Sequence, residues 1–147
     1  LYLTKSASFD GTKTIFISTN LDPFDVIGAE SRRQPAAGCM VAAIEFATGR
    51  KSVTLGKPSA TLWDVINKEL GGGDIDPRNV LMVGDRRDTD IRFGNNCGMK
   101  TAVVLSGCTT PEEIIENEKD DYKNGDRPDI IIPHVGLIHS QDPAGQL

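Results

Sequence analysis

The sequence predicts an α/β domain built on a parallel sheet with helices on both faces. Short apolar or β-branched runs recur along the 147 residues, at 14–19, 52–55, 80–83, 101–105 and 130–132. Segments with helical spacing or helix-start signals separate most of these runs. The run at 80–83 is continuously apolar and ends at Gly84, which is typical of a strand buried on both faces. Strands that alternate with helices favour a parallel sheet with helices on both sides.

The first fifty residues predict a strand, a loop and a helix. Residues 14–19 (TIFIST) are β-branched and aromatic, as in a strand. Residues 20–35 are rich in Asp, Pro and Gly, so we expect a loop. Residues 37–48 carry apolar side chains at helical spacing, and Gly49 is placed to end that helix.

The next segment predicts a short strand over 52–55 that closes on a Gly-Lys-Pro-Ser turn, residues 56–59. Ser59 or Thr61 is expected to cap the helix that follows, and the three glycines 71–73 end it. After the strand at 80–83, residues 89–96 predict a short helix before Gly98.

The last helix has a clear start. Thr110-Pro111-Glu112-Glu113 combines a capping box with proline at the first helical position. A charged loop, 120–129, then leads to the apolar strand at 130–132.

Composition excludes several function classes. Sixteen basic against 21 acidic residues give a net charge of -5, which offers no support for nucleic-acid binding. No stretch approaches the ~20 apolar residues of a membrane span, so we expect no membrane role. Three widely spaced cysteines without metal-site spacing fit thiols in a reducing compartment, and we expect the cytoplasm.

The residues most suggestive of chemistry are Asp85, Asp90 and Lys57. Asp85 follows the strand at 80–83, where open α/β folds bind ligands, and Asp90 lies five positions later. Lys57 follows the preceding strand. If these two strands are parallel neighbours, their ends meet at one edge of the sheet. A carboxylate there suits Mg²⁺, and a lysine beside it suits phosphoryl transfer. Taken singly, each residue is more ordinary: a solvated turn, a helix cap, or an exposed acid in a first helical turn.

These residues resemble a known family. Gly56-Lys57-Pro58-Ser59, then 81–86 (LMVGDR) and 89–91 (TDI), are similar to the third and fourth motifs of haloacid-dehalogenase (HAD)-type phosphatases. The closer resemblance is to the branch with phosphoglycolate phosphatase, pyridoxal phosphate phosphatase and 4-nitrophenylphosphatase. The resemblance implies a cap segment over 1–50, and the C-terminal half of a HAD-like core over 51–147.

The resemblance also implies a Mg²⁺-dependent phosphomonoester hydrolase with an aspartyl-phosphate intermediate. Asp85 would be the metal ligand, and Asp90 would support the metal or its waters. Lys57 would hold the phosphoryl group and the nucleophile. Substrates would be small phosphorylated metabolites, such as 2-phosphoglycolate or aryl phosphates.

The family's first motif, an apolar strand ending in Asp-x-Asp-Gly, does not occur in the sequence. The nearest stretch, Ser8-Phe9-Asp10-Gly11, has serine at the attacking position and reads as a turn. We therefore expect the chain to be the C-terminal part of such an enzyme, inactive alone and prone to association through an uncovered sheet edge.

In the cap-like segment, residues 20–33 correspond to the loop that leans over the substrate in relatives, so Asn20 and Asp25 are candidate substrate-binding residues. Asp25 stands roughly where pyridoxal phosphate phosphatases carry histidine, which disfavours that substrate. The family's cap often mediates dimerisation, so the resemblance implies a homodimer through the cap.

Two alternatives stay open. The chain could be an inactive short form that binds a metal or a partner. A signalling receiver is the weaker alternative, because its acidic pair would lie near the start and its lysine would follow the phospho-accepting aspartate.

Overall fold

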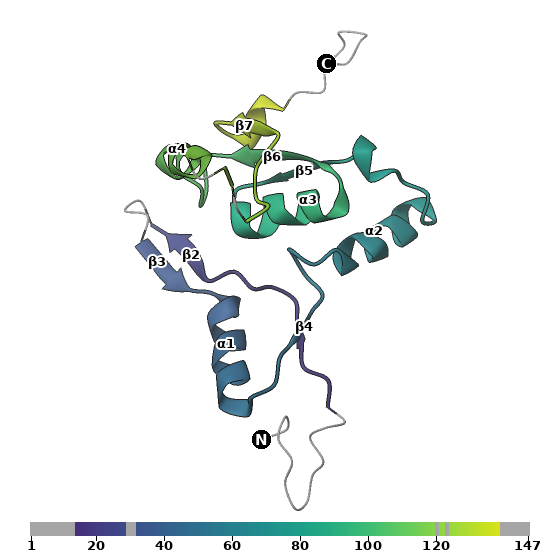
Figure 1. Cartoon of the computed structure of the whole chain (residues 1–147), viewed down its shortest axis with the longest axis vertical. Coiled ribbons are helices and arrows are strands. Elements are labelled where there is room, and N and C mark those ends of the chain that lie inside the picture. The colour runs from purple at the N-terminus through teal and green to yellow at the C-terminus, as the bar shows by residue number, and fades with distance from the viewer. Residues whose placement is uncertain (1–13, 29–31, 120, 123, 139–147) are drawn as a thin grey trace, which may run out of the picture.

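The centre of the molecule is a three-stranded parallel sheet. The computed structural model describes residues 14–28, 32–119, 121–122 and 124–138. Its sheet has the order β5 (Leu81–Gly84), β6 (Lys100–Val104), β7 (Ile130–Ile132), with β6 in the middle (Figure 1). The apolar runs at 80–83, 101–105 and 130–132 thus form parallel strands, which confirms the predicted α/β class.

The core lies where two helical segments meet β6. Ile91, Val103 and Ile114 pack together, and the first two are completely buried. Burying a side chain of this size contributes about 1.5–3 kcal/mol. Ile114 comes from α4 (Pro111–Lys119), and Gly94 of α3 (Arg92–Cys97) approaches Thr101 so closely that a Cβ there would overlap it. These contacts fix α3 and α4 against the central strand.

Two smaller sheets lie outside this core. β1 (Ile17–Ser18) and β4 (Val53–Thr54) form a parallel pair, so strands from either side of the boundary predicted at 50/51 hydrogen-bond to each other. β2 (Phe24–Ile27) and β3 (Arg32–Pro35) form an antiparallel hairpin. The loop expected over 20–35 is therefore wrong. Each strand of the hairpin is only four residues long, which is too short for a clear sequence pattern. Its backbone hydrogen bonds are made with the partner strand, so the pairing cannot be read from neighbouring residues.

For the first two helices, the predicted C-terminal ends match the structure better than the predicted N-terminal starts. α1 (Ala37–Thr48) ends at Gly49, whose φ of 68° suits glycine. α2 (Thr61–Gly71) ends at Gly72. Its N-cap is Ala60, so neither predicted capping residue holds that position. The Ser59 hydroxyl instead accepts a hydrogen bond from the Thr61 N–H at 3.3 Å, in the turn before the helix.

The later helices follow the expected order. The 3₁₀ turn Pro77–Asn79 precedes β5, and Val135–Leu137 forms another after β7. The helix expected over 89–96 is a π-helical turn, Arg87–Ile91, that continues into α3 and ends at Gly98. At α4 the predicted capping box forms in both directions. Thr110 N–H donates to Glu113 Oε2 and Glu113 N–H to Thr110 Oγ1, each at 3.3 Å.

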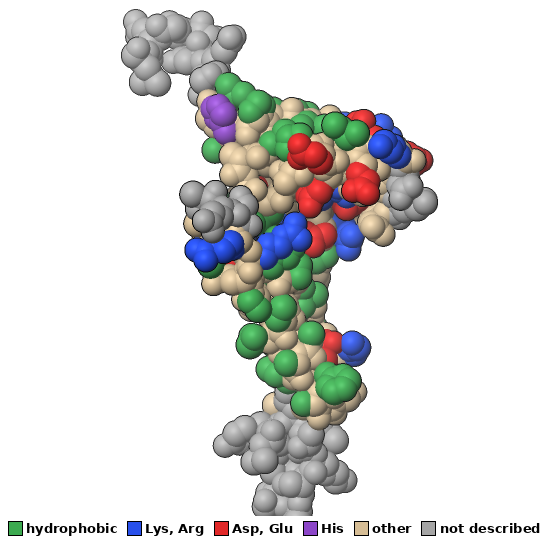
Figure 2. Space-filling view, turned by 90° about the vertical axis from the view of Figure 1, so that its left-hand side faces the viewer, with side chains coloured by type: hydrophobic (Ala, Val, Ile, Leu, Met, Phe, Trp, Pro, Cys, Tyr) green, Lys and Arg blue, Asp and Glu red, His purple; other side chains and the backbone are tan. Residues whose placement is uncertain are grey.

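Charged side chains are unevenly distributed over the surface. Figure 2 shows most acidic and basic groups on the upper part, whereas the narrow lower part is mainly hydrophobic. None of the α1 residues is buried, and the Phe46 side chain is 93% exposed. Within the described residues, no helix is long and apolar enough to cross a membrane.

Candidate active site

Lys57 and Asp90 form an ion pair beside the C-terminal end of β5. The Lys57 ammonium contacts Asp90 Oδ1, and the Arg86 N–H donates to Asp90 Oδ2 at 3.1 Å. The Asp90 side chain is only 6% exposed, whereas that of Lys57 is 40% exposed. Asp90 is thus a buried carboxylate with a partner at each oxygen. The Lys57 ammonium, which is more exposed, lies between this carboxylate and the molecular surface.

Glycine is required at two positions around this pair. A Cβ at Gly84 would overlap the Asp90 carboxylate, and one at Gly56 would overlap the Thr19 carbonyl. The glycine at the end of β5 therefore makes room for Asp90, in addition to allowing the chain to turn.

The predicted convergence of Lys57 with a carboxylate is observed, but the expected route is wrong. β4 pairs with β1 and is not a neighbour of β5. The turn that carries Lys57 is instead held against α3, because Asn96 Nδ2 donates to the Pro58 carbonyl at 2.9 Å. Tertiary contacts with a helix, rather than strand adjacency, bring the lysine to Asp90.

Asp85 is held by the turn that follows β6. Its Oδ2 accepts the Cys108 N–H at 2.9 Å, and its backbone carbonyl accepts the Thr109 N–H at 2.9 Å. A Cβ at Gly107 would overlap the carboxylate. Two strand ends, β5 and β6, therefore fix the orientation of this side chain.

Asp85 and residues of the hairpin line one cavity of about 440 Å³. The core side of this cavity is formed by Asp85 and by residues 106–108, and the hairpin side by Asp25, Val26 and Gly28. The predicted substrate residue Asp25 thus lines the same cavity as the predicted metal ligand Asp85.

The donor chemistry of this cavity fits Mg²⁺. That ion takes oxygen ligands and often only one or two carboxylates, completing its shell with water and substrate phosphate. Asp85 would supply one carboxylate. Among the described residues there is no group of three or more His, Cys, Asp or Glu placed to hold a metal. With the ligand preference of this ion, Asp85 would hold it together with water and substrate oxygens.

Asn20 lines neither this cavity nor the next one described. Its Nδ2 donates to Asp22 Oδ2 at 2.7 Å, and its Oδ1 accepts the Asp22 N–H. Asp22 in turn lies 3.6 Å from Arg86 Nε. Within the described part of the chain, Asn20 shapes the approach to the hairpin rather than the cavity wall.

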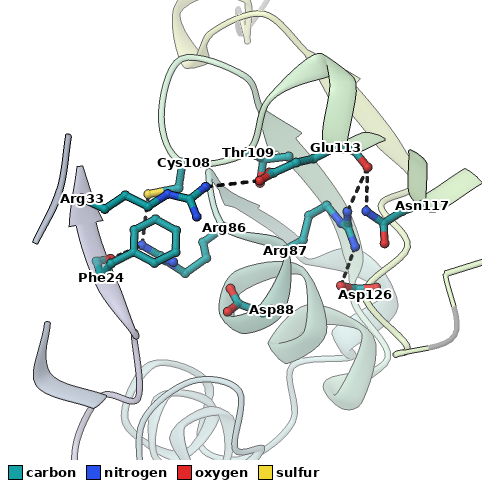
Figure 3. Close-up of a pocket in the computed structure, with 10 residues that line it drawn as sticks. All are labelled: Phe24, Arg33, Arg86, Arg87, Asp88, Cys108, Thr109, Glu113, Asn117 and Asp126. Carbon is teal, nitrogen blue, oxygen red and sulfur yellow. Dashed lines mark hydrogen bonds and ion pairs between the residues drawn. The ribbon is translucent and has the colours of Figure 1, made fainter. Parts of the chain in front are cut away.

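A second cavity of about 260 Å³ is lined by Arg86 and shares Cys108 with the first (Figure 3). The Phe24 ring lies there between the guanidinium groups of Arg33 and Arg86, at 4.1 and 4.5 Å. Arg87 donates to Asp126 at 2.6 Å, and both side chains are at least nine-tenths buried. From sequence, Arg33 is a possible partner of a substrate carboxylate or a solvated loop residue, and Arg86 is part of the motif at 81–86 with no role of its own. Phe24, Arg87 and Asp126 carry no local signal that predicts these contacts.

Burial and local charge set the protonation of two groups near the cavities. Burial raises the pKa of Asp88, although Arg86 opposes the effect. Burial, followed by the charge of Asp85, raises the pKa of the Cys108 thiol to about 11. Cys108 therefore stays a neutral thiol at physiological pH and is a poor nucleophile.

Comparison with known proteins agrees with this geometry. Residues 54–137 match the model of the HAD-hydrolase-like family, and they include Lys57, Asp85 and Asp90. The chain belongs to the HAD-like hydrolase family.

Relatives within this family are phosphatases. Glycerol-3-phosphate phosphatase from Gallus gallus is 40% identical over 103 residues, which cover 69% of this chain and 32% of the relative. Human chronophin is 39% identical over 99 residues, covering 67% of this chain and 32% of the relative. The chain thus spans about a third of the length of these relatives.

Solved structures give the same assignment. 4-Nitrophenylphosphatase from Thermotoga maritima aligns with a TM-score of 0.68 and 34% identity, covering 85% of this chain and 44% of that one. Glycerol phosphate phosphatase Rv1692 from Mycobacterium tuberculosis, solved in complex with magnesium, aligns with a TM-score of 0.62 and 30% identity. That alignment covers 82% of this chain and 33% of the mycobacterial protein.

Proposed function

We propose that this chain supplies the metal- and phosphate-handling part of a Mg²⁺-dependent phosphomonoester hydrolase. The observation that carries the proposal is the Lys57–Asp90 pair, with its buried carboxylate, at the end of β5, which Asp85 follows directly. Phosphoryl transfer needs cations that offset the charge on the phosphoryl oxygens, and a lysine and a metal-binding carboxylate at one strand end provide for them.

Each residue has a role in this proposal. Asp85 is the metal ligand, and Mg²⁺ bound there would polarise the phosphoryl oxygens. Lys57 holds the phosphoryl group and the nucleophile, while Asp90 orients the lysine and supports the waters of the metal. The nucleophile would be an aspartate of an Asp-x-Asp-Gly strand, giving an aspartyl-phosphate intermediate. That strand would belong to an N-terminal half that this chain lacks; the short span relative to its relatives supports this view.

The substrate is a small phosphorylated metabolite, and the charge of Asp25 favours some such metabolites over others. A carboxylate on the cavity wall repels the carboxylate of 2-phosphoglycolate but accepts hydrogen bonds from hydroxyl groups. We therefore propose glycerol 3-phosphate and aryl phosphates ahead of 2-phosphoglycolate. A cytoplasmic location and a homodimer through the cap segment complete the proposal.

The test is phosphate release, with Mg²⁺, from 4-nitrophenyl phosphate, glycerol 3-phosphate and 2-phosphoglycolate. We expect turnover from a chain extended at its N-terminus by the Asp-x-Asp-Gly half, and none from residues 1–147 alone. In the extended protein, Asp85→Asn should lower the rate by about two orders of magnitude or more. Strong Mg²⁺-dependent turnover by the 147-residue chain would contradict the missing nucleophile.

A second candidate is an inactive short form that binds a metal or a partner. The absence of buried residues in α1 and the span of a third of the relatives favour it. Upstream coding sequence with Asp-x-Asp-Gly in the same transcript would decide for the enzyme, and a transcript without it for the short form.

A further inference from the structure

Arg86 connects the end of β5 with the hairpin. Its backbone N–H donates to Asp90, while its side chain lines the second cavity and reaches the hairpin at Phe24. Nη2 donates to the Phe24 carbonyl oxygen and to Cys108 Sγ, the latter at 3.1 Å, and Nε lies 3.6 Å from Asp22 Oδ1. The side chain is only 9% exposed. A buried guanidinium with donors engaged on both sides is a rigid link, because its planar fork fixes the positions of its partners.

The same guanidinium stacks on the Phe24 ring, where a second arginine provides a comparison (Figure 3). Arg33 also stacks on this ring, but it belongs to the hairpin itself and its side chain is 58% exposed. Its link to the rest of the molecule is a 3.5 Å ion pair with Glu113, of a kind that contributes little. A cation over an aromatic ring is worth more when it is shielded from water. Arg86 is therefore the stronger of the two links between the hairpin and the sheet.

Holding Phe24 also places its neighbour. Asp25 follows Phe24 in β2 and lines the same cavity as Asp85. Cys108, which contacts the Arg86 guanidinium, donates its N–H to Asp85. The Arg86 side chain thus contacts both Phe24, which precedes Asp25, and Cys108, which donates to Asp85. We propose that Arg86 is a positioning residue that latches the β2–β3 hairpin over Asp85 and sets the spacing between Asp25 and Asp85. The importance of that spacing for substrate rests on the proposed function; the latch itself does not.

The first test is amide hydrogen exchange by NMR on the 147-residue chain. We expect Arg86→Lys and Phe24→Leu to speed exchange in the hairpin about tenfold, because a shielded stacked arginine is not replaced by lysine. The matched Arg33→Lys change, at the same ring, should have less than about a twofold effect. Amides of β6 should be unaffected. The Arg86 Nε–H proton should also resonate upfield under the ring and lose that shift in Phe24→Leu.

Three results would overturn the latch: no acceleration in either Arg86→Lys or Phe24→Leu, equal acceleration in Arg33→Lys, or acceleration in β6 as large as in the hairpin. If Arg86→Lys fails to fold, Phe24→Leu decides, since it leaves the Arg86 contacts with Asp22 and Asp90 in place.

A second measurement separates the latch from the proposed metal site. Mn²⁺ bound at Asp85 should broaden the NMR signals of Asp25 and Val26 in the unaltered chain. In Arg86→Lys this broadening should weaken, while that of Gly107 stays the same. Unchanged broadening of the hairpin signals in Arg86→Lys would contradict the latch. Absence of broadening at Gly107 in the unaltered chain would contradict the metal site, and the exchange experiment would then decide the latch alone.

Discussion

Replacing Lys57 with methionine should destabilise the fold through the charge that it leaves behind. The Asp90 carboxylate is 6% exposed, and without Lys57 it would keep, among the described residues, only the Arg86 N–H as a hydrogen-bond partner. Removing one member of a fully buried pair costs about 3–5 kcal/mol. Because the Lys57 side chain is 40% exposed, water can partly replace it, so we expect about 1–3 kcal/mol.

Asp90→Asn should cost less, about 1 kcal/mol, since the lysine left behind can reach solvent. The double variant no longer carries the orphaned carboxylate, so it should be at least as stable as Lys57→Met alone, which gives a coupling free energy of about 1 kcal/mol or more. Urea denaturation at pH 7, followed by far-UV circular dichroism, measures all four proteins. Lys100→Met is the matched control. Lys100 lies 3.5 Å from Asp129 in a pair that is 67% and 40% exposed, and its loss should cost under about 0.5 kcal/mol.

Additive effects of Lys57→Met and Asp90→Asn, within the ~0.3–0.5 kcal/mol of independent sites, would refute this reasoning. A cost for Lys100→Met equal to that for Lys57→Met would refute it as well, because burial would then not distinguish the two pairs.

Three further predictions concern the metal turn, acid stability and association. Gly107→Ala should displace the Asp85 carboxylate and weaken Mg²⁺ binding about tenfold or more by calorimetry; unchanged affinity would remove this turn from the site. Although burial raises the pKa of Asp129, hydrogen bonds from Thr101 and Lys100 lower it overall, below its ordinary value of 3.8. A carboxyl with a lowered pKa stabilises the fold above the unfolded pKa, and this contribution disappears as pH falls through the folded pKa, below about pH 4. Thr101→Val should flatten acid unfolding there, and an unchanged acid profile would count against the assignment. The exposed side chains of Phe46, Leu70 and Ile15, at 93%, 79% and 71%, should make the isolated chain associate in sedimentation experiments. A monomer with a sharp two-state melt would contradict this last expectation.

Sequence alone predicted what depends on neighbouring residues. The capping box at Thr110, the helix end at Gly49 and the apolar strand before Gly84 are local signals, and all three appear in the structure. The prediction that Lys57 and Asp90 lie close together is correct, but its reason is wrong. It assumed that β4 neighbours β5, whereas β4 pairs with β1, and that pairing depends on tertiary structure.

The hairpin and Arg86 could not be predicted from such signals. The apolar pattern of Phe24–Ile27 is too short, and too closely flanked by turn residues, to predict a strand. Its backbone hydrogen bonds with Arg32–Pro35 form only when the chain folds. Arg86 looks like any charged residue in a turn until Phe24, 62 positions earlier, is placed against it. The stretch around Asp10, expected to be a turn, lies outside the described residues.

The central claim is that Asp85 is the metal-binding carboxylate of this site. A Mg²⁺ titration of the chain, followed by NMR, tests it with Asp85→Asn and with the matched change Asp88→Asn, three residues away on the other cavity. We predict Mg²⁺-dependent shifts centred on Asp85 and residues 106–108, retained in Asp88→Asn and abolished in Asp85→Asn. Shifts that persist in Asp85→Asn, or that disappear only in Asp88→Asn, would contradict the claim.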